Sequence, residues 1–505
     1  MALPFSETAD DPYSYLVPMG YMNSSSCGYC CKTVDDKGKP IRRLMFYATT
    51  KSLKPEFYQT LVDRCWRRSG KLVYRPNQRE ACCPHYTIRL DASAYRPTRD
   101  HRQTVNRFSR YVVGDEYTKT AQRVRPLSRE EAKRRDTTFD LSERLHEVES
   151  CNLPSLQASR TRHRSKSKPA GTEGSEPDSL PPPKTIDPAH RFEVTLEPDT
   201  YTDEKYEIYA NYQRIIHKEP DSKISKPTFT SFLCNSSLRR ETEIERDESG
   251  GIREKKLGSY HQCYRLDGRL VAVGVLDLLP HCVSAVYFMY HESIHEFNPG
   301  KLSAMREIAL AIEGGYKWWY SGFYIASCPK MRYKLGFMPQ YVLDPETYQW
   351  DAFDKKSQEL YVRQPYVSLS RERRLLERAA EEDGKEETDA KEEKNKQEEK
   401  KEKAGMDDNS TAEDDSFSDE DDVILPLLRS NMPGLPTLEQ VSEYKLGHIP
   451  ILTSHEPEPF PAFYLASWAG SSFTDNASIK SRLAELVAMI GEDLAPNICL
   501  DFRKQ

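Results

Sequence analysis

The chain has 505 residues and a net charge of −6; 30% of its residues are charged, 37% are hydrophobic and the mean hydropathy is −0.76, values that combine folded and solvated segments. The longest apolar stretch, residues 270–290, is interrupted by Asp277, Pro280 and His281, and the first residues carry acids where a secretion signal has none. We therefore expect a soluble cytoplasmic protein with no membrane partner, whose 12 cysteines serve as thiols, metal ligands or catalytic groups rather than in disulfides.

Charge is distributed unevenly along the chain. Residues 27–135 hold 26 Lys and Arg against 11 Asp and Glu, whereas residues 381–422 hold 20 acids against 7 lysines. A basic module of this size suits a polyphosphate partner such as RNA, although a solvated basic surface is an equal alternative on charge alone. The acidic run is typical of a disordered insertion.

These shifts in composition divide the chain into six segments. Between Asn152 and Pro188 the sequence is rich in Ser, Pro and basic residues and has nothing to bury, so it predicts a linker whose basic start could act as a nuclear signal. The segments are an N-terminal tail (1–19), a cysteine-rich, metal-binding basic module (20–125), the linker (126–188), an α/β domain (189–370), the acidic insertion (371–422) and the completion of the α/β domain (423–505).

The basic module contains two pairs of cysteines. Cys27 and Cys30 form a CxxC motif, and Cys82 and Cys83 follow 52 residues after Cys30, close to His85. Thiolates two residues apart in a tight turn can bind one tetrahedral metal. Adjacent cysteines point to opposite sides of an extended chain, so His85 is an alternative to one of them. A four-sulfur site would accept zinc or an iron–sulfur cluster.

The α/β domain has a distinctive order of predicted elements. A helix starts at residue 203 with Thr202 as its N-cap, and two apolar strands joined at Asp267-Gly268 are followed by a third strand over 282–290. A helix with Asn298 as its N-cap and a strand over 318–325 complete the unit. This order predicts an α/β (α+β) fold of the GNAT acyltransferase type, in which a central sheet splits to admit an acyl donor.

His291, Glu292 and His295 match the HExxH spacing of zinc peptidases. Two imidazoles four residues apart share a metal only when the backbone between them is helical. A strand is predicted up to Tyr290, and the helix-breaking residues 298–300 follow closely, so a long helix does not fit there. We expect polar residues on a loop rather than a peptidase site.

Seven blocks of sequence together resemble one family. They are CGYC, DRCWRRSGKLVYRP, CCPHYTIRL, GRLVAVGVLDLLP, LSAMREIA, YIASCPKMRYK and PETYQW, in the order in which the eukaryotic arginyl-tRNA–protein transferases carry them. The resemblance covers residues 20–110 and 195–350. It implies a GNAT-type fold and the transfer of arginine from arginyl-tRNA to the N-terminal amine of proteins that begin with Asp, Glu or oxidised Cys. That modification marks the acceptor for ubiquitin-dependent degradation, with a ubiquitin ligase as a downstream partner.

The resemblance also bears on the metal ligands. The family's four N-terminal cysteines fall on Cys27, Cys30, Cys82 and Cys83. This match favours Cys83 over His85 as the fourth ligand. The choice between zinc and an iron–sulfur cluster stays open.

Two positions depart from the family pattern. Ala326 stands where the family's block has a histidine, and residues 335–337, Leu-Gly-Phe, replace a more polar stretch. If that histidine is catalytic, transfer by this chain should be impaired. A non-catalytic, metal-stapled tRNA-binding adaptor with a GNAT-like unit is therefore the alternative function.

The predicted donor site favours RNA over coenzyme A. Coenzyme A enzymes of the GNAT type hold the pyrophosphate on a glycine-rich loop at a helix N-terminus, whereas residues 298–301 read Asn-Pro-Gly-Lys. We expect no coenzyme A, which disfavours an ordinary acetyltransferase. In the basic module Trp66, Arg67, Arg68 and Tyr74 offer stacking and charge for the tRNA.

The expected reaction is aminolysis of an ester, which needs no strong base because an N-terminal amine titrates at about 7.7 to 8.0. Asp277 interrupts an apolar strand and is the candidate for orienting that amine or accepting its proton; capping of the turn at Pro280 is the alternative. Lys330, Arg332 and the adjacent Tyr333 are candidates for binding the acceptor, with the two cations on its side-chain carboxylate. Simple solvation of these exposed cations is the alternative.

Overall fold

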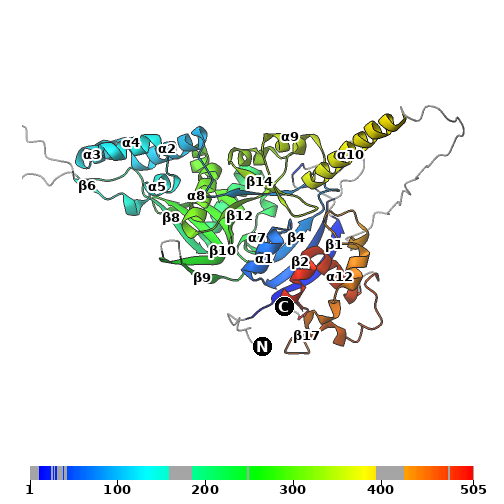
Figure 1. The fold of residues 1–505 in the computed structure, drawn as a ribbon. Coiled ribbons are helices and arrows are strands. Elements are labelled where there is room, and N and C mark those ends of the chain that lie inside the picture. Colours follow the sequence, from blue (N-terminus) through cyan, green and yellow to red (C-terminus); the bar gives the residue numbers. More distant parts are fainter. Residues whose placement is uncertain are drawn as a thin grey trace, which may run out of the picture.

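The computed structural model describes residues 11–23, 27, 29–30, 34, 38, 43–157, 185–246, 250–393, 426–475 and 478–503. Two β-sheets form the body of the molecule, and a group of helices extends from one end while a long helix projects from the other (Figure 1). Residues 158–184 of the expected linker and residues 394–422 of the acidic insertion lie outside the described residues. The described part of the linker contains helices over Arg129–Thr137 and Leu141–His146, and a helix over Leu369–Glu393 enters the insertion.

The first sheet has seven strands in the order β17-β16-β18-β1-β2-β4-β3. Two helices, α1 (Pro55–Val62) and α12 (Ile479–Ile490), bury their apolar faces in the same core as this sheet. In sheet order the strands are β17 (Phe460–Pro461), β16 (Pro450–Leu452), β18 (Ile498–Asp501), β1 (Ser14–Asn23), β2 (Leu44–Ser52), β4 (Leu72–Pro76) and β3 (Arg67–Ser69).

The second sheet has nine strands, eight of them in the order β15-β14-β5-β13-β12-β11-β10-β8, and β9 pairs with β10. A separate two-stranded sheet joins β6 (Leu156–Gln157) to β7 (Thr185–Ile186). The strands of the second sheet are β15 (Trp350–Ala352), β14 (Gln340–Leu343), β5 (Tyr86–Asp91), β13 (Trp318–Tyr324), β12 (Cys282–Tyr290), β11 (Arg269–Leu279), β10 (Ile252–Leu266), β8 (Phe192–Pro198) and β9 (Glu241–Arg246).

Helices of several kinds connect and cover the sheets. The other α-helices are α2 (Arg99–Val113), α3 (Asp115–Val124), α4 (Arg129–Thr137), α5 (Leu141–His146), α6 (Asp203–Tyr212), α7 (Lys226–Leu233), α8 (Pro299–Gly314), α9 (Lys355–Arg363), α10 (Leu369–Glu393) and α11 (Leu438–Glu443). The short helices are the π turn η2 (Gln213–His217) and the 3₁₀ turns η1 (Ser150–Asn152), η3 (Asp221–Lys223), η4 (Glu292–Phe297), η5 (Pro329–Gly336), η6 (Leu427–Arg429), η7 (Leu446–His448), η8 (Ala462–Tyr464) and η9 (Glu492–Asn497).

The centre of the second sheet is covered on both faces. Along β11, Leu276 and Leu278 lie in the apolar cluster of α8, whereas Val273 and Val275 lie in the cluster of α6 and α7. Side chains alternate between the two faces of a strand, so α8 and α6 lie on opposite sides of the sheet. This coverage explains why the strand is a nearly continuous apolar run.

Several predicted elements are confirmed. The Thr202 side chain accepts a hydrogen bond from the backbone N–H of Lys205 and caps α6, and the turn at Asp267-Gly268 joins β10 to β11. The helix after Asn298 also forms, but Asn298 has a left-handed backbone (φ 53°) and its side chain makes no capping hydrogen bond. The predicted strands over 282–290 and 318–325 correspond to β12 and β13.

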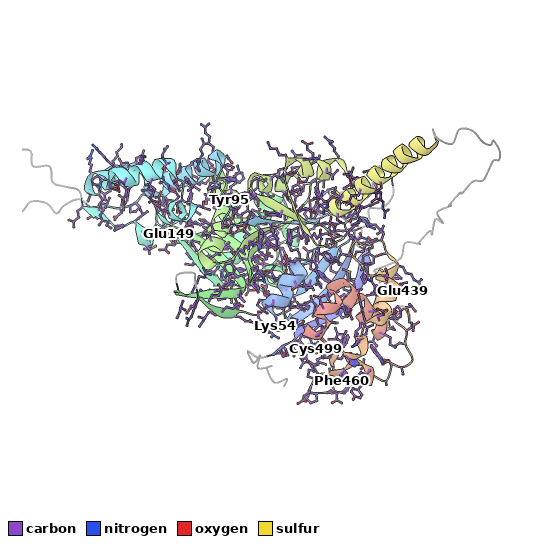
Figure 2. All side chains as sticks on the ribbon, in the orientation of Figure 1. Lys54, Tyr95, Glu149, Glu439, Phe460 and Cys499 are labelled. Carbon is purple, nitrogen blue, oxygen red and sulfur yellow. The ribbon has the colours of Figure 1, made fainter. Side chains whose placement is uncertain are left out.

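The C-terminal segment 423–505 corrects an expectation. Its strands β16, β17 and β18 join the first sheet, where β18 runs parallel to β1, and they do not complete the 189–370 domain. Phe460 and Cys499 accordingly lie well away from Glu149, which is at the helical end of the molecule (Figure 2). Conversely, β5 of the basic module lies between β13 and β14 in the second sheet. The boundary expected at residue 125 therefore does not separate the two sheets.

The HExxH residues lie where β12 ends. β12 stops at Tyr290, and Glu292–Phe297 form only the 3₁₀ turn η4. His291 accepts a hydrogen bond from the backbone N–H of Ser293, and His295 pairs with the Tyr290 hydroxyl at 2.9 Å. The residues thus have local structural partners and no α-helix to align them on a metal, as we expected. Across the described chain, no helix has the length and apolarity needed to cross a membrane.

The parallel strands β12 and β13 separate part-way along their length, at a place that we call the fork. They pair only from Cys282 to Ser284 and from Trp318 to Tyr320. Beyond the fork β13 has a bulge against β5, and Gly322 takes a left-handed backbone (φ 79°) there. The strands therefore open towards the end of β12, from which the chain continues through η4 into α8.

Candidate metal centre and strand fork

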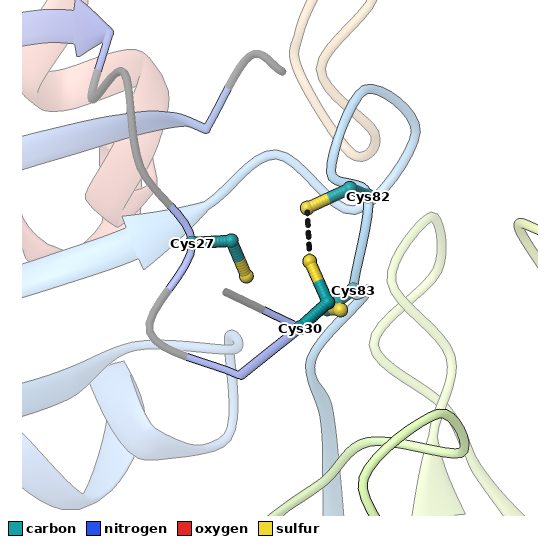
Figure 3. A group of neighbouring side chains, drawn as sticks. All are labelled: Cys27, Cys30, Cys82 and Cys83. Atoms are coloured by element: carbon teal, nitrogen blue, oxygen red, sulfur yellow. Dashed lines mark hydrogen bonds between the residues drawn. The ribbon is translucent and has the colours of Figure 1, made fainter. Parts of the chain in front are cut away.

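Cys27, Cys30, Cys82 and Cys83 form a cluster whose sulfur atoms all lie within 4.8 Å of one another (Figure 3). The first pair lies between β1 and β2, and the second pair lies between β4 and β5. The Cys30 and Cys82 sulfurs are 3.8 Å apart. All four cysteines are free thiols, so the two loops are not joined by a disulfide here.

The chemistry of the cluster fits a soft metal ion. Four sulfurs bound at about 2.3 Å to one tetrahedral ion lie about 3.8 Å apart, which matches the separation between the Cys30 and Cys82 sulfurs. Burial raises the pKa of the Cys83 thiol to about 11. Burial would also raise the pKa of Cys27, but hydrogen bonds from the backbone N–H groups of Cys30 and Tyr29 lower it to about 7. One thiolate therefore forms readily, and a bound cation would stabilise the others.

His85 is not part of this cluster. The metal-binding group found among the described residues contains the four cysteines alone. The His85 ring instead packs edge-on against Tyr29 and Phe323, with centroids 5.0 and 5.1 Å away. Burial lowers the pKa of His85 to about 3, so the ring is neutral. The local turn at Cys82 and Cys83 brings both sulfurs to the centre.

The cysteine cluster contacts the chain that follows β13. The Ser327 hydroxyl donates to the Cys83 sulfur at 3.2 Å. Ile325 and Cys328 are buried in one apolar cluster with Cys27 and Cys83. The segment 325–334 therefore rests on the cysteine centre at one end and reaches the fork at the other.

The Lys334 side chain binds β13 at the fork. Its ammonium donates to the carbonyls of Ser321 (2.6 Å) and Phe323 (2.8 Å), which lie beyond the residues of β13 that pair with β12. A side chain on Gly322 would come within 3.9 Å of that ammonium. Burial lowers the pKa of Lys334 to about 8, and the charge of Arg67 adds to the effect.

Glu307 is a buried carboxylate on α8 beneath the same region. It accepts hydrogen bonds from Ser303 and from the indole N–H of Trp319, both at 2.7 Å. Burial raises its pKa to about 6, despite these two donors. Glu307 is thus a group whose protonation changes close to neutral pH, in the covered centre of the sheet.

The candidate acceptor-binding residues Lys330, Arg332 and Tyr333 lie on η5, at the surface beside the fork. The Lys330 ammonium is 3.4 Å from Nδ1 of His217, whose other ring nitrogen is 3.3 Å from the Tyr287 hydroxyl. These contacts bring η5 against η2 and β12. The exposed cations are therefore placed at the edge of the opening.

Asp277 and Arg68, which we expected to orient the amine and bind RNA, form an ion pair with each other. Arg68 Nε lies 2.8 Å from Oδ2 of Asp277, and Nη2 lies 2.5 Å from Oδ1 and 2.8 Å from the Ser259 hydroxyl. Both side chains are almost fully buried. The pair joins β3 of the first sheet to β11 of the second, so both predictions are corrected to a structural role.

The other expected tRNA contacts also lie inside the protein. Trp66 is fully buried and donates to the carbonyl of Met489 at 3.2 Å. Tyr74 is half-buried, with its ring 6.4 Å from that of Phe323, and Arg67 is buried above the same ring. These side chains cannot stack on or pair with an RNA from these positions. The basic, aromatic motif at 64–75 instead builds the contact between the two sheets.

The exposed positive charge lies on the helical end formed by α2, α3 and α4, which we call the basic arm (Figure 1). Nine of its exposed cations have no ion-pair partner within the described structure. An open groove of about 500 Å³ runs along α2 to the start of α8. The nine cations are Arg99, Arg102, Arg107, Arg110, Lys119, Arg123, Arg125, Arg129 and Lys133.

Sequence reasoning missed Glu307, Lys334 and the basic arm. Glu307 had a detectable signal, because it lies on the buried face of a helix among the apolar residues Ala304, Ile308 and Ala311. Lys334 had none, because its role depends on the separation of two distant strands. The charge count included the basic arm, but the predicted tRNA contacts were placed at residues 66–74 because aromatic and basic side chains occur together there.

Two family models match parts of the chain. The model "Arginine-tRNA-protein transferase, N terminus" matches residues 25–103, and its C-terminal counterpart matches residues 204–344. The first match spans the cysteine cluster and the second spans the fork. The chain is thus similar to the arginyl-tRNA–protein transferases over both parts, which supports an arginyltransferase, and its N-terminal part contains four cysteines that could hold a metal ion.

Individual relatives with similar sequences are also named as transferases. The chain is 24% identical to arginyl-tRNA–protein transferase 1 of Dictyostelium discoideum, over 68% of this chain and 84% of the relative. It is 26% identical to arginyl-tRNA–protein transferase 2 of Arabidopsis thaliana, over 69% and 76%. A shorter alignment, covering 28% of this chain and 52% of the relative, is 31% identical to an aspartate/glutamate leucyltransferase of Stutzerimonas stutzeri (strain A1501).

Proposed function

We propose that this protein transfers arginine from arginyl-tRNA to the N-terminal amine of acceptor proteins that begin with Asp, Glu or oxidised Cys. The names of its relatives support the donor and the group transferred. The acceptor becomes a substrate for ubiquitin-dependent degradation in the cytoplasm, and in the nucleus if the basic linker acts as a signal.

The fork is the observation that carries the proposal. We infer a GNAT-like acyltransferase unit, because the parallel strands β12 and β13 pair over only three residues each and α8 connects them. The open end of the fork gives an ester and an amine a place to meet within the sheet. α8 begins at Pro299, at the same end, where the positive end of the helix dipole favours a negatively charged donor.

The chemistry asked of the site is modest. A neutral N-terminal amine attacks the ester carbonyl of arginyl-tRNA, the tRNA ribose oxygen leaves, and the amine loses a proton. Orientation of the two substrates and stabilisation of the oxyanion supply most of the acceleration. Among the residues described at the fork, Glu307 replaces Asp277 as the candidate for orienting the amine or accepting its proton. Burial raises the pKa of Glu307 to about 6.

The proposed acceptor has an acidic first residue. A relative over part of this chain is named an aspartate/glutamate leucyltransferase, which supports an acidic acceptor here. Lys330, Arg332 and Tyr333 line the surface beside the fork and are placed to attract such a peptide. Opposite charges at the rim of a site mainly raise the rate of association.

The basic arm is the proposed surface for the tRNA. Its groove ends at Asn298, next to the start of α8, and Lys301 of α8 pairs with Asp100 of α2 at 2.6 Å. An RNA backbone along α2 would therefore lead its charged end towards the fork. Replacing Arg102, Arg107 and Arg110 with Gln should reduce the slope of log Kd against log salt by about 0.7 to 0.9 for each phosphate that the arm no longer neutralises. The same change at the exposed Arg371 and Arg378 of α10 should leave the slope unaltered.

The four cysteines are proposed to hold one zinc ion. The sulfur separations support a single tetrahedral ion, since the cysteines of an iron–sulfur cluster bind different iron atoms and lie farther apart. Bound zinc would join the two cysteine loops and, through Cys83 and Ser327, hold the segment 325–334 in place.

A transfer assay tests the proposed function. The purified protein, labelled arginyl-tRNA and a peptide with a free N-terminal Asp should give a labelled peptide. An N-acetylated copy and a copy beginning with Ala should stay unlabelled, because one lacks the nucleophile and the other lacks the acid. Binding of tRNA without transfer to any peptide would instead favour a non-catalytic adaptor and would implicate Ala326.

A further inference from the structure

β3 places two neighbouring arginines in the contact between the sheets, but only one of them has a carboxylate partner. Arg68 meets the carboxylate of Asp277 in a two-pronged ion pair. Arg67 donates from Nη1 to the carbonyls of Trp66 (2.8 Å) and Val62 (3.4 Å), while its Nε and Nη2 have no partner in the described structure. An isolated buried guanidinium costs several kcal/mol, so its retention needs a reason.

Arg67 is not the only unpaired cation at this place. Lys334 has no ion pair within the described residues, and the positive charge of Arg67 helps to lower its pKa. Phe323 lies between them, with its ring 5.1 Å from the Arg67 guanidinium and its carbonyl 2.8 Å from the Lys334 ammonium. The Ser321 hydroxyl, on the same bulge, is also buried without a partner in the described structure.

We propose that Arg67 and Lys334, with the Ser321 hydroxyl, form the internal site for the side-chain carboxylate of the acceptor's first residue. This inference rests on the proposed function and gives that function its specificity. Arg67 would bind the carboxylate through Nε and Nη2, in the way that its neighbour Arg68 binds Asp277. Lys330 and Arg332 at the surface then attract the acidic peptide towards the fork. Arg67 and Lys334 inside recognise the carboxylate of its first residue.

Charge and space favour this ligand over the other partners. The arginyl group of the donor is itself a cation, and two buried cations would repel it. A phosphodiester backbone is too bulky for a site covered by the Phe323 ring. Arg67, Ser321, Phe323 and Lys334 each keep 7 to 9% of their surface exposed, so they border the exterior, and movement of the ring would admit a small carboxylate.

The test compares peptides that differ only in a first residue of Asp or Asn. The two side chains have the same shape, so the ratio of their kcat/KM values measures recognition of the charge. Arg67→Met should lower the Asp/Asn ratio about 10- to 150-fold, the value of one charge-assisted hydrogen bond. Transfer to the Asn peptide should fall less than transfer to the Asp peptide, because the amide carries no charge. The exposed Arg371→Met is the matched control and should keep the wild-type ratio.

A second measurement separates a binding role from a structural one. Without acceptor, Arg67→Met should raise the melting temperature, because it removes a buried charge that has no partner. A variant that melts lower and loses transfer to both peptides equally would show that Arg67 only supports the fold and would overturn the site. If Arg67→Met does not fold, Arg67→Lys decides: it keeps the charge but loses the two-pronged geometry, so the ratio should still fall. An unchanged ratio in that variant would also reject the proposal.

The outcome for the wild type keeps the two proposals apart. Transfer to neither peptide would reject arginine transfer to acidic N-termini itself. Transfer to the Asp peptide, with a ratio that no Arg67 variant changes, would keep the function and reject this site.

Discussion

Asp277 and Arg68 are held by each other, and this pairing has a direct consequence for stability. Asp277→Ala would leave the Arg68 charge buried without its partner, at a cost of about 3 to 5 kcal/mol in the free energy of unfolding. Replacing both residues, as Arg68→Met with Asp277→Leu, should recover most of that loss. Urea unfolding of Arg68→Met, Asp277→Leu and the double variant measures the coupling between the two residues.

A different result would restore the catalytic hypothesis for Asp277. If Asp277→Asn kept the wild-type unfolding energy but lost transfer by orders of magnitude, the carboxylate would be acting on the substrate. We expect the reverse, a loss of stability with transfer reduced only as far as the folded fraction falls.

The cysteine centre makes a prediction for metal content. Replacing Cys27, Cys30, Cys82 or Cys83 with Ser should lower the bound zinc measured by mass spectrometry, because each removes one of four ligands. Cys328→Ser is the matched control, since Cys328 packs beside the cluster without belonging to it. Iron and labile sulfide in place of zinc would show that the site holds a cluster.

At the scale of the residue, sequence reasoning succeeded where the signal was local. Cys27 and Cys30 are two residues apart in a motif whose spacing is set by metal geometry, so the pattern is visible in the chain itself. Asp277 was predicted to be catalytic and Arg68 to bind tRNA, but their pairing across 209 positions was not predicted. Burial depends on the packing of both sheets, and neither residue type nor local pattern determines it.

At the scale of the element, α12 carries a carboxylate that should make stability depend on pH. Glu485 is buried and accepts a hydrogen bond from the backbone N–H of Leu427 at 2.8 Å, and burial raises its pKa to about 6. The folded state therefore binds a proton more tightly than the unfolded state does. The stabilisation that protonated Glu485 gives the folded state is fully present below the ordinary pKa of about 4.5, and it is lost as the pH rises through about 6.

Replacing the Glu485 carboxyl with an amide should remove this loss of stability at high pH. Glu485→Gln keeps an oxygen for Leu427, so at pH 8 it should raise the unfolding free energy by about 2 kcal/mol, and by much less at pH 5. Urea unfolding at the two pH values measures the difference. Glu443→Gln, on the exposed side of α11, should have no such effect, and an equal gain in both variants would refute the assignment.

The elements themselves were largely predictable from the sequence. The capped helix α6, the hairpin between β10 and β11, and the order β12, α8, β13 follow from local periodicity and turn residues. The HExxH residues were correctly assigned to a turn for the same reason, because a strand and a breaker leave no room for a long helix. The fork was not locatable, since it depends on the residue at which two strands stop pairing.

At the scale of the whole molecule, the C-terminal segment should be required for the N-terminal sheet. The buried Arg75 donates to the carbonyl of Pro433 at 2.6 Å, and Trp66 donates to that of Met489. A chain that ends at residue 425 would lack α12, β16 and β18 and would expose the core that they share with β1. We expect it to be insoluble or rapidly digested in limited proteolysis. Co-expression of residues 426–505 should rescue it, because the missing strands pair without a covalent connection.

A truncated chain with wild-type solubility and metal content would contradict this interpretation. It would mean that the first sheet is stable with β1 as an edge strand. The long stretch of apolar side chains in α12 that faces this sheet makes that outcome unfavourable.

The sequence by itself determined the local elements, the cysteine motif, the uneven distribution of charge and, by resemblance, the family. These features depend on residues that are neighbours in the chain or lie in one continuous block. Only the tertiary structure decided that the last strands join the first sheet, that the basic residues 67 and 68 lie inside and those of α2 outside, and that Lys334 lies at the fork. Each depends on pairing or burial between distant segments, and the free energy of such interactions is set by the whole packed core.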